Sequence, residues 1–250
     1  MFSLLIECEP ADRDLLIADL WERGSAGISE PDDHHVRAFF EDEADRDGLV
    51  RLFPAAVLRD EEPRDWVAAA RDLMRPMEIG RRFFLVPEWL DDPAPSGRFR
   101  IAVNPGMAFG TGVHETTQLC IEALEQYVRP GMRVLDVGTG SGILAQAATL
   151  LGASQVYACD IDPIAVAIAG TGFVGSADAV APAAVDLVVA NISPEAIIAL
   201  APDLRRVLRH GGVLLASGFE GPEVDAVRPA LEPIQEVRYK GNWSLAVSLA

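Results

Sequence analysis

The residues best suited to chemistry in this chain lie in a glycine-rich turn and in an acidic side chain downstream of it. Gly138, Gly140 and Gly142 come directly after the strand-like run 134–137 and before a helix-like apolar segment. Glycine has no Cβ, so such a turn lets the backbone bend sharply and approach a ligand closely. A second apolar segment ends at Asp160, where a carboxylate can accept both hydroxyls of a ribose. The order strand, turn, helix, strand and acid predicts a βαβ unit that binds a nucleoside.

The spacing of the glycines indicates which kind of nucleoside. Dinucleotide-binding folds use G-x-G-x-x-G, whereas this turn is G-x-G-x-G, with Ile143 at the third dinucleotide position. The tighter spacing disfavours a dehydrogenase. It resembles that of the S-adenosylmethionine (AdoMet) methyltransferases, whose cofactor has no pyrophosphate. The alternative is a glycine-rich turn in an unrelated α/β protein.

Composition and cysteine usage indicate a soluble, intracellular protein. Half of the 250 residues are apolar, which suffices for a large core. No apolar run reaches the roughly 18 residues that span a bilayer, and the acidic start of the chain is unlike a signal peptide. Cys8, Cys120 and Cys159 have no metal-site spacing and are expected to be buried thiols in a reducing cytoplasm. We expect no metal.

Negative charge is concentrated near the N-terminus. The chain has a net charge of −17, and residues 1–50 contain fourteen acidic residues and only four arginines. Nucleic-acid binding requires clustered Lys and Arg, so direct contact with nucleic acid is not expected. An acidic surface of this kind suits a basic protein partner. A solvated surface that keeps the protein soluble is the alternative.

The order of the predicted elements divides the chain into three parts. Residues 1–60 show the order βαββαβ, typical of a ferredoxin-like α+β sandwich, and contain nothing that resembles a catalytic site, so we interpret them as a recognition domain. Residues 61–97 are expected to form a linker helix and a connector. In residues 98–250 strands and helices alternate, and two strands flank Lys240-Gly-Asn242 at the end. This pattern predicts an α/β fold with a doubly wound, mostly parallel Rossmann-like sheet and a terminal antiparallel hairpin.

One further segment narrows the interpretation. Asn104-Pro-Gly-Met-Ala-Phe-Gly-Thr-Gly-Val-His-Glu-Thr-Thr117 resembles the P-G-x-A-F-G-T-G-x-H-x-T-T signature of the ribosomal protein methyltransferases often called PrmA. The likeness extends over nearly the whole chain, including strand 185–192 and segment 209–218. It implies an AdoMet-dependent N-methyltransferase domain in residues 98–250. The implied substrate is the large-subunit, stalk-base ribosomal protein eleven, modified at lysines and at its N-terminal amine.

The resemblance also implies the residues that bind AdoMet. The family's contacts fall on Thr117, Gly138, Asp160 and Asn191, and Gly140 and Gly142 complete the turn. Thr117 is expected early in a helix, where free N–H groups favour the cofactor's carboxylate. Asn191 ends a strand, and its amide can orient the methionine amine or the incoming nucleophile. A helix N-cap before Pro194 is the other role for Asn191 and is compatible with the first.

The sequence departs from the family pattern in two places. After Asp162 the family has a longer helix, and roughly ten residues of that pattern are absent here, either because the helix is short or because a stretch is missing from the chain. Asp178 is expected to place a carboxylate near the adenine despite this difference. The second departure is Ser193-Pro194 after Asn191-Ile, which could alter the approach of the substrate.

No residue is clearly the base that would deprotonate the substrate amine. His114 is a candidate because its pKa lies near neutrality, but a histidine in such a loop can instead shape it or cap the next helix. Phe109 could pack against a lysine stem or an ammonium, or only pack within the loop. We therefore name Asn191, His114 and Phe109 as catalytic candidates. The competing hypotheses are a methyltransferase for another protein or a small molecule, and a non-catalytic AdoMet-binding scaffold.

Overall fold

The chain folds into two compact units with separate cores. The computed structural model describes residues 1–10, 13–32, 34–61, 75–103, 114–170 and 172–249. One unit comprises Met1–Leu73 and the other Met74–Ala250, so the division falls within the stretch 61–97 that the sequence predicts as a connector. The linker helix predicted near 63–73 lies outside the described residues.

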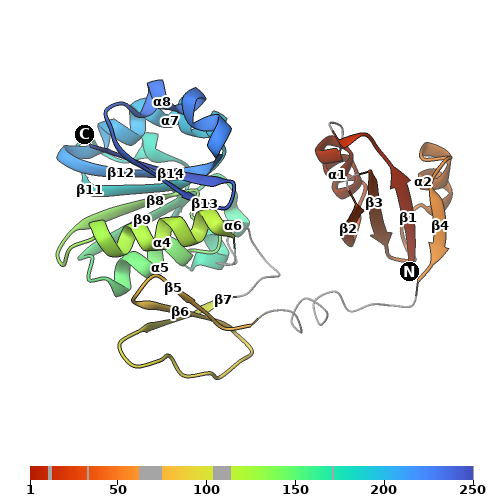
Figure 1. Cartoon of the computed structure of the whole chain (residues 1–250), viewed down its shortest axis with the longest axis horizontal. Coiled ribbons are helices and arrows are strands. Elements are labelled where there is room, and N and C mark those ends of the chain that lie inside the picture. The colour runs from red at the N-terminus through yellow and green to blue at the C-terminus, as the bar shows by residue number, and fades with distance from the viewer. Residues whose placement is uncertain (11–12, 33, 62–74, 104–113, 171, 250) are drawn as a thin grey trace. The chain divides into compact units, whose positions relative to one another are not determined.

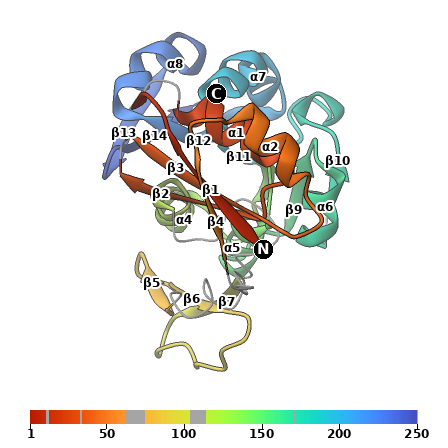
Figure 2. The same cartoon turned by 90° about the vertical axis from the view of Figure 1, so that its right-hand side faces the viewer.

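The N-terminal unit is a four-stranded sheet with two helices on one face (Figure 2). Its strand order is β2-β3-β1-β4, and each neighbouring pair is antiparallel. Phe2, Leu4 and Ile6 alternate along β1, so they point to the same face and pack with Leu20 and Leu49 of the helices. The order of these elements is the βαββαβ order read from the sequence. The elements are β1 (Phe2–Glu7), α1 (Arg13–Glu22), β2 (Gly27–Asp32), β3 (His35–Phe40), α2 (Arg46–Leu52) and β4 (Val57–Asp60).

The C-terminal unit is built on a seven-stranded sheet with the order β10-β9-β8-β11-β12-β14-β13. The pairs from β10 to β12 are parallel, and the last two strands form the predicted antiparallel hairpin. The fold class predicted from the sequence is therefore confirmed. The strands are β8 (Arg133–Val137), β9 (Gln155–Asp160), β10 (Phe173–Val174), β11 (Val185–Asn191), β12 (Leu208–Glu220), β13 (Ile234–Lys240) and β14 (Trp243–Leu249).

Helices cover both faces of this sheet. Figure 1 shows α4 and α5 on one side and α7 and α8 on the other. Each side has its own cluster of buried aliphatic residues, because the parallel strands are apolar on both faces. The helices are α4 (Glu115–Tyr127), α5 (Ile143–Leu150), α6 (Pro163–Ala169), α7 (Pro194–Arg206) and α8 (Val224–Leu231), with one-turn 3-10 helices η2 (Ala177–Ala179) and η3 (Gly221–Glu223).

A second, three-stranded sheet precedes α4 in the chain. It comprises β5 (Met77–Ile79), β6 (Phe83–Pro87) and β7 (Phe99–Val103), and β6 and β7 pair in parallel across the loop between them. The three residues of β5 lie in the stretch 61–97 that the sequence predicts only as a linker helix and a connector.

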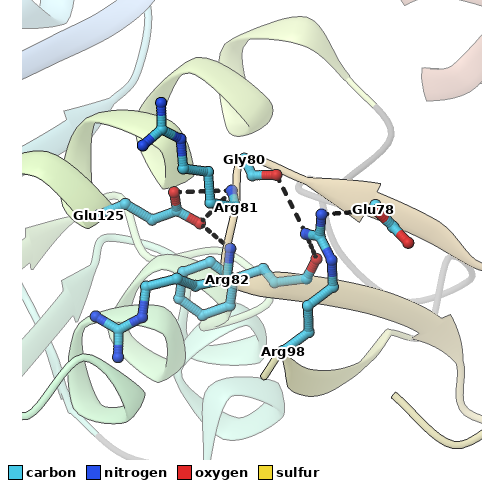
Figure 3. Close-up of polar contacts among 7 residues, drawn as sticks. Glu78, Gly80, Arg81, Arg82, Arg98 and Glu125 are labelled. Atoms are coloured by element: carbon cyan, nitrogen blue, oxygen red, sulfur yellow. Dashed lines mark hydrogen bonds and ion pairs between the residues drawn. The ribbon is translucent and has the colours of Figure 1, made fainter. Parts of the chain in front are cut away.

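Polar contacts fasten this small sheet to α4 (Figure 3). The carboxylate of Glu125, near the end of α4, accepts hydrogen bonds from the backbone N–H groups of Arg81 (3.0 Å) and Arg82 (2.7 Å). Arg98 donates to the carbonyls of Gly80 and Phe83 and pairs with Glu78. These contacts fix the start of β7, the strand that precedes the signature segment 104–117.

The short segment after Asp162 connects β9 to β10 through the helix α6. Asp162 caps α6, and Gly170 ends it in a left-handed conformation. The two-residue β10 then pairs with the end of β9. An added Cβ at Gly172 would lie 2.5 Å from the carbonyl oxygen of Ala158, so this tight return needs a glycine. A short helix, the first of the two alternatives, therefore suffices to keep the sheet continuous.

Two other expectations concern the whole chain. Among the described residues, no helix has the length and apolar character needed to cross a membrane. Cys120 and Cys159 are buried free thiols, and Cys8 is partly buried. Burial raises the pKa of the Cys159 thiol to about 12, so it is inert at neutral pH.

Candidate cofactor-binding site

A cavity of about 330 Å³ opens beside the glycine-rich turn. It lies at the carboxyl ends of β8, β9 and β11, where open α/β sheets bind ligands. Of the predicted cofactor contacts, Thr117, Gly138, Gly140, Asp160 and Asn191 line this cavity, whereas Gly142 does not. The lining residues are Thr117, Val137, Gly138, Thr139, Gly140, Ile143, Leu144, Asp160, Ile161, Gly175, Ser176, Asn191, Ile192, Ala196 and Leu200.

The backbone conformation favours glycine at all three positions of the turn, and at Gly138 the available space requires it as well. Gly138, Gly140 and Gly142 have φ values of +71°, +52° and +79°, which L side chains rarely adopt. A Cβ at Gly138 would lie 2.3 Å from Cγ2 of Ile192. The backbone of the turn therefore approaches the end of β11 more closely than any other residue would allow.

Asp160 connects the end of β9 to this turn. Its Oδ2 accepts a hydrogen bond from the N–H of Gly140 at 2.9 Å, and its Oδ1 accepts one from the N–H of Asp162 at 3.0 Å. Each carboxylate oxygen has a second lone pair, so the group can still accept the hydroxyls of a ribose. The two backbone donors fix its orientation at the cavity wall.

The first turn of α4 forms another part of the wall. Thr117 lines the cavity and is only 1% exposed. His114 is the N-cap of this helix, and its side chain accepts from the N–H of Thr116. Of its two predicted roles, capping is therefore seen directly in the structure.

Asn191 ends β11 and faces the cavity. Its Nδ2 donates to Oγ1 of Thr116 on α4 at 3.2 Å. The N-cap of α7 is Ser193, whose side chain accepts from the N–H of Ala196. The capping role considered for Asn191 is thus filled by another residue, and the side chain of Asn191 is available to the cavity.

A buried carboxylate lies beneath the turn. Asp136 is fully buried, and its Oδ2 accepts from the hydroxyl of Thr139 (2.8 Å) and the N–H of Ala145 (3.0 Å). Burial raises the pKa of Asp136 to about 6, although these two hydrogen bonds oppose the shift. The carboxylate fastens the turn to the first residues of α5.

The remaining candidates lie elsewhere. Asp178 is exposed on η2 and is not part of the cavity wall, which in this region consists of Gly175 and Ser176. Phe109 lies outside the described residues. Among the residues that the structure describes, no group of three or more His, Cys, Asp or Glu could hold a metal ion.

Sequence reasoning missed the apolar part of the wall. Ile143, Leu144, Ile161, Ile192 and Leu200 line the cavity, and none of them is among the predicted ligand contacts. For Ile161 the sequence does offer an indication, because this apolar residue directly follows the predicted ribose-binding Asp160. In the structure Ile161 is 81% exposed. An apolar side chain at the open end of a strand suits the face of an adenine.

Comparison with known proteins agrees with this geometry. The family model described as "Ribosomal protein L11 methyltransferase (PrmA)" matches residues 12–247. This chain belongs to that family. The ribosomal protein L11 methyltransferase of Pelotomaculum thermopropionicum is 44% identical over 215 residues, covering 78% of this chain and 70% of that protein. That of Symbiobacterium thermophilum is 43% identical over 194 residues, covering 74% of this chain and 64% of that protein.

A solved structure from the same family has a similar fold. The ribosomal protein L11 methylase of Lactobacillus delbrueckii subsp. bulgaricus superposes with a TM-score of 0.64 at 34% identity, covering 70% of this chain and 99% of that one. The ribosomal protein methyltransferase signature in the sequence therefore identified the family correctly.

The cavity fits the cofactor expected of a methyltransferase in this family. Its volume is within the range of small-molecule sites, and its wall combines apolar side chains with a carboxylate, an amide and a helix N-terminus. Because Gly138 has no Cβ, the side chain of Ile192 packs directly against the turn, and both residues line the cavity. These groups match the adenine, ribose and methionine parts of AdoMet.

Proposed function

We propose that this chain is an AdoMet-dependent N-methyltransferase that modifies lysine side chains, the N-terminal amine, or both, in ribosomal protein L11. The observation that carries the proposal is the hydrogen bond that the N–H of Gly140 donates to the carboxylate of Asp160 at the cavity wall. It joins the ribose-binding acid and the glycine turn into one preformed site. A ribosomal substrate and the free thiols of Cys120 and Cys159 are consistent with a cytoplasmic enzyme.

Four residues are proposed to hold the cofactor. Asp160 accepts the ribose hydroxyls, and the turn at Gly138 lies under the methionine part. The first turn of α4, at Thr117, offers N–H groups to the carboxylate. Asn191 contacts an amine. Asp178 remains a proposal for the adenine end and requires a movement of η2, because it is exposed there.

AdoMet supplies a methyl group that is already activated on a sulfonium. The protein's task is therefore to align and desolvate the reactants. A substrate lysine must arrive neutral, and the apolar wall formed by Ile192, Ala196 and Leu200 would favour the neutral amine by desolvation. This leaves water as an adequate acceptor for the proton and does not require His114 as a base.

The N-terminal unit is proposed to attract the substrate. Its carboxylates at Glu7, Glu9, Glu41, Asp42 and Glu43 are exposed, and a basic ribosomal protein would be drawn to them by long-range attraction. The Michaelis constant for the protein substrate should then rise with ionic strength while AdoMet binding changes little. The same charge argues against direct contact with RNA.

The decisive experiment measures methyl transfer from labelled AdoMet to purified, unmethylated ribosomal protein L11. Asp160→Ala removes the ribose acceptor, and Asp225→Asn on α8, whose side chain is 94% exposed, serves as the matched control. We expect label with the wild type and with Asp225→Asn, and none with Asp160→Ala. Mass spectrometry of digested product then assigns the methyl groups to lysines or to the N-terminus.

The failures of this experiment point to different alternatives. AdoMet binding without transfer to ribosomal protein L11 would exclude that substrate and favour another protein or a small molecule. AdoMet binding without transfer to any protein or small-molecule amine would favour a scaffold. A wild type that does not bind AdoMet would contradict the proposed function altogether.

A further inference from the structure

A chain of hydrogen bonds connects Asn191 at the cavity to the N-cap of α4. Asn191 Nδ2 lies 3.2 Å from Oγ1 of Thr116, and Oγ1 lies 2.8 Å from Nδ1 of His114. The N–H of Thr116 points to the same Nδ1 at 3.3 Å. Thr116 is only 2% exposed, so its hydroxyl relies on these partners.

The direction of every bond in this chain follows from one fixed donor. A backbone N–H can only donate, so Nδ1 of His114 must accept and carries no proton. The Thr116 hydroxyl must then donate its single proton to Nδ1, and it has none left for Asn191. It can therefore only accept from Asn191, which places the amide nitrogen of Asn191 toward Thr116 and leaves Oδ1 for a ligand.

The ring of His114 also packs against a residue of β14. Trp243 at the start of β14 meets it edge-on, with ring centroids 4.6 Å apart. The acceptor nitrogen of His114 is thus kept at the helix N-terminus by both capping and aromatic packing. Because the ring cannot turn away, Nδ1 of His114 stays directed at the N–H and the hydroxyl of Thr116.

We propose that Thr116 is a positioning residue that sets the orientation of the Asn191 amide, so that Oδ1 is presented to an amine N–H group in the cavity. The inference rests on the proposed function for the identity of that amine. Two sources are available, the ammonium of the methionine part of AdoMet and the amine of the substrate. A reversed amide would present N–H donors, which would repel the methionine ammonium and would occupy the lone pair that a neutral substrate amine needs for attack.

The first test examines the bond directions without any ligand. Two-bond ¹⁵N–¹H spectra of the full chain report which ring nitrogen of each histidine carries a proton, and His114→Asn identifies the His114 signals. We expect neutral His114 with the proton on Nε2. A proton on Nδ1 would reverse the chain and overturn the proposal. Because no AdoMet is needed, this result stands even if the proposed function fails.

The second test removes the hydroxyl alone. Thr116→Val keeps the shape of the side chain, Thr116→Ser restores the hydroxyl, and Thr149→Val removes a hydroxyl that bonds only within α5. We expect Thr116→Val to lower kcat/KM about three- to tenfold, the loss of one hydrogen bond, and Thr116→Ser to recover most of it. A Thr116→Val variant with wild-type kinetics, or a Thr116→Ser variant that is equally impaired, would overturn the proposal.

The kinetic constants distinguish the two amines. If Oδ1 accepts from the methionine ammonium, Thr116→Val raises the dissociation constant for AdoMet and leaves kcat unchanged. If it accepts from the substrate amine, kcat falls and AdoMet binding is unchanged. Either pattern supports the proposal, and the choice assigns the partner of Oδ1.

A double-mutant cycle separates orientation from simple packing. Asn191→Asp has an acceptor oxygen at both positions, so its orientation no longer matters. We expect Thr116→Val to cost less than about twofold in the Asn191→Asp background, in contrast to its cost in the wild type. Equal costs in both backgrounds would show that Thr116 acts only on packing and would overturn the proposal.

Discussion

The carboxylate of Glu125 occupies the space beside Gly80 that a side chain would need. An ideal Cβ on Gly80 would lie 2.6 Å from both carboxylate oxygens, and Gly80 has a φ of +54°. In this position the carboxylate of Glu125 accepts hydrogen bonds from the backbone N–H groups of Arg81 and Arg82 (Figure 3). Gly80 and Glu125 together attach the β5–β6 turn to α4, the helix whose other end forms the cavity wall.

The substitution Gly80→Ala should therefore cost more than backbone strain. The added Cβ displaces a carboxylate that accepts two backbone N–H groups, at about 1–3 kcal/mol for hydrogen bonds to a charged group. Gly97→Ala is the matched control, because Gly97 has a φ of +84° and open space around its Cβ position. We expect the control to cost about 1–2 kcal/mol. Thermal unfolding and amide exchange at Arg82 measure the difference, and equal effects of the two variants would contradict the role of Glu125.

Gly138→Ala should weaken AdoMet binding more than tenfold while the protein stays folded. The new Cβ would lie 2.3 Å from Ile192, so the turn and the end of β11 must separate, and the cavity lies between them. Gly131→Ala provides the comparison, since Gly131 also has a positive φ, +89°, but no atom within 4 Å of its Cβ position. Calorimetry should show more than a tenfold loss of affinity for Gly138→Ala only. Retained affinity would mean that the turn does not contact the cofactor.

Local patterns in the sequence predicted most of the C-terminal fold. β8 covers the predicted run 134–137, and β14 follows the predicted turn at Lys240-Gly-Asn242, because each strand is an apolar run bounded by a turn signal. β12 passes through segment 209–212, whose two glycines are typical of a turn, with a register shift opposite Val185. β5 was missed because its three residues carry no pattern of their own and depend on pairing with β6.

The site was predicted to the extent that its residues end strands or begin helices. Gly138, Asp160, Asn191 and Thr117 have such positions, so topology alone brings them to one edge. Thr116 has no such signal, because its contact with Asn191 depends on how α4 packs beside β11. The exposure of Asp178 likewise depends on tertiary packing, because Arg206 of α7 holds η2 through the backbone carbonyls of Ala177 and Asp178.

The buried carboxylate of Asp136 should make stability depend on pH in an unusual direction. Its pKa is raised by burial to about 6 from 3.8, so between these values the folded state holds a proton that the unfolded state has lost. The free energy of unfolding must then fall as pH rises from about 4 to 6, by up to about 3 kcal/mol. Asp136→Asn stays neutral and should lose this dependence.

Urea unfolding at pH 4, 5, 6 and 7 without ligand measures this contribution. The informative quantity is the difference between Asp136→Asn and wild type, which should favour the variant increasingly as pH rises. Asp225→Asn is the control, because that exposed carboxylate should give curves parallel to wild type. A difference that is constant across this range would mean that Asp136 ionises normally.

His114 should act through its acceptor nitrogen and not as a base. Its Nδ1 caps α4 by accepting from Thr116, a role that an asparagine oxygen fills equally well, whereas asparagine cannot take up a proton. We therefore expect His114→Asn to keep methyl transfer within about threefold of wild type. His114→Ala, which loses the cap, should destabilise the protein by about 1 kcal/mol and reduce transfer further. If the asparagine variant were as inactive as the alanine variant while remaining as stable as wild type, the imidazole itself would be needed for the proton transfer.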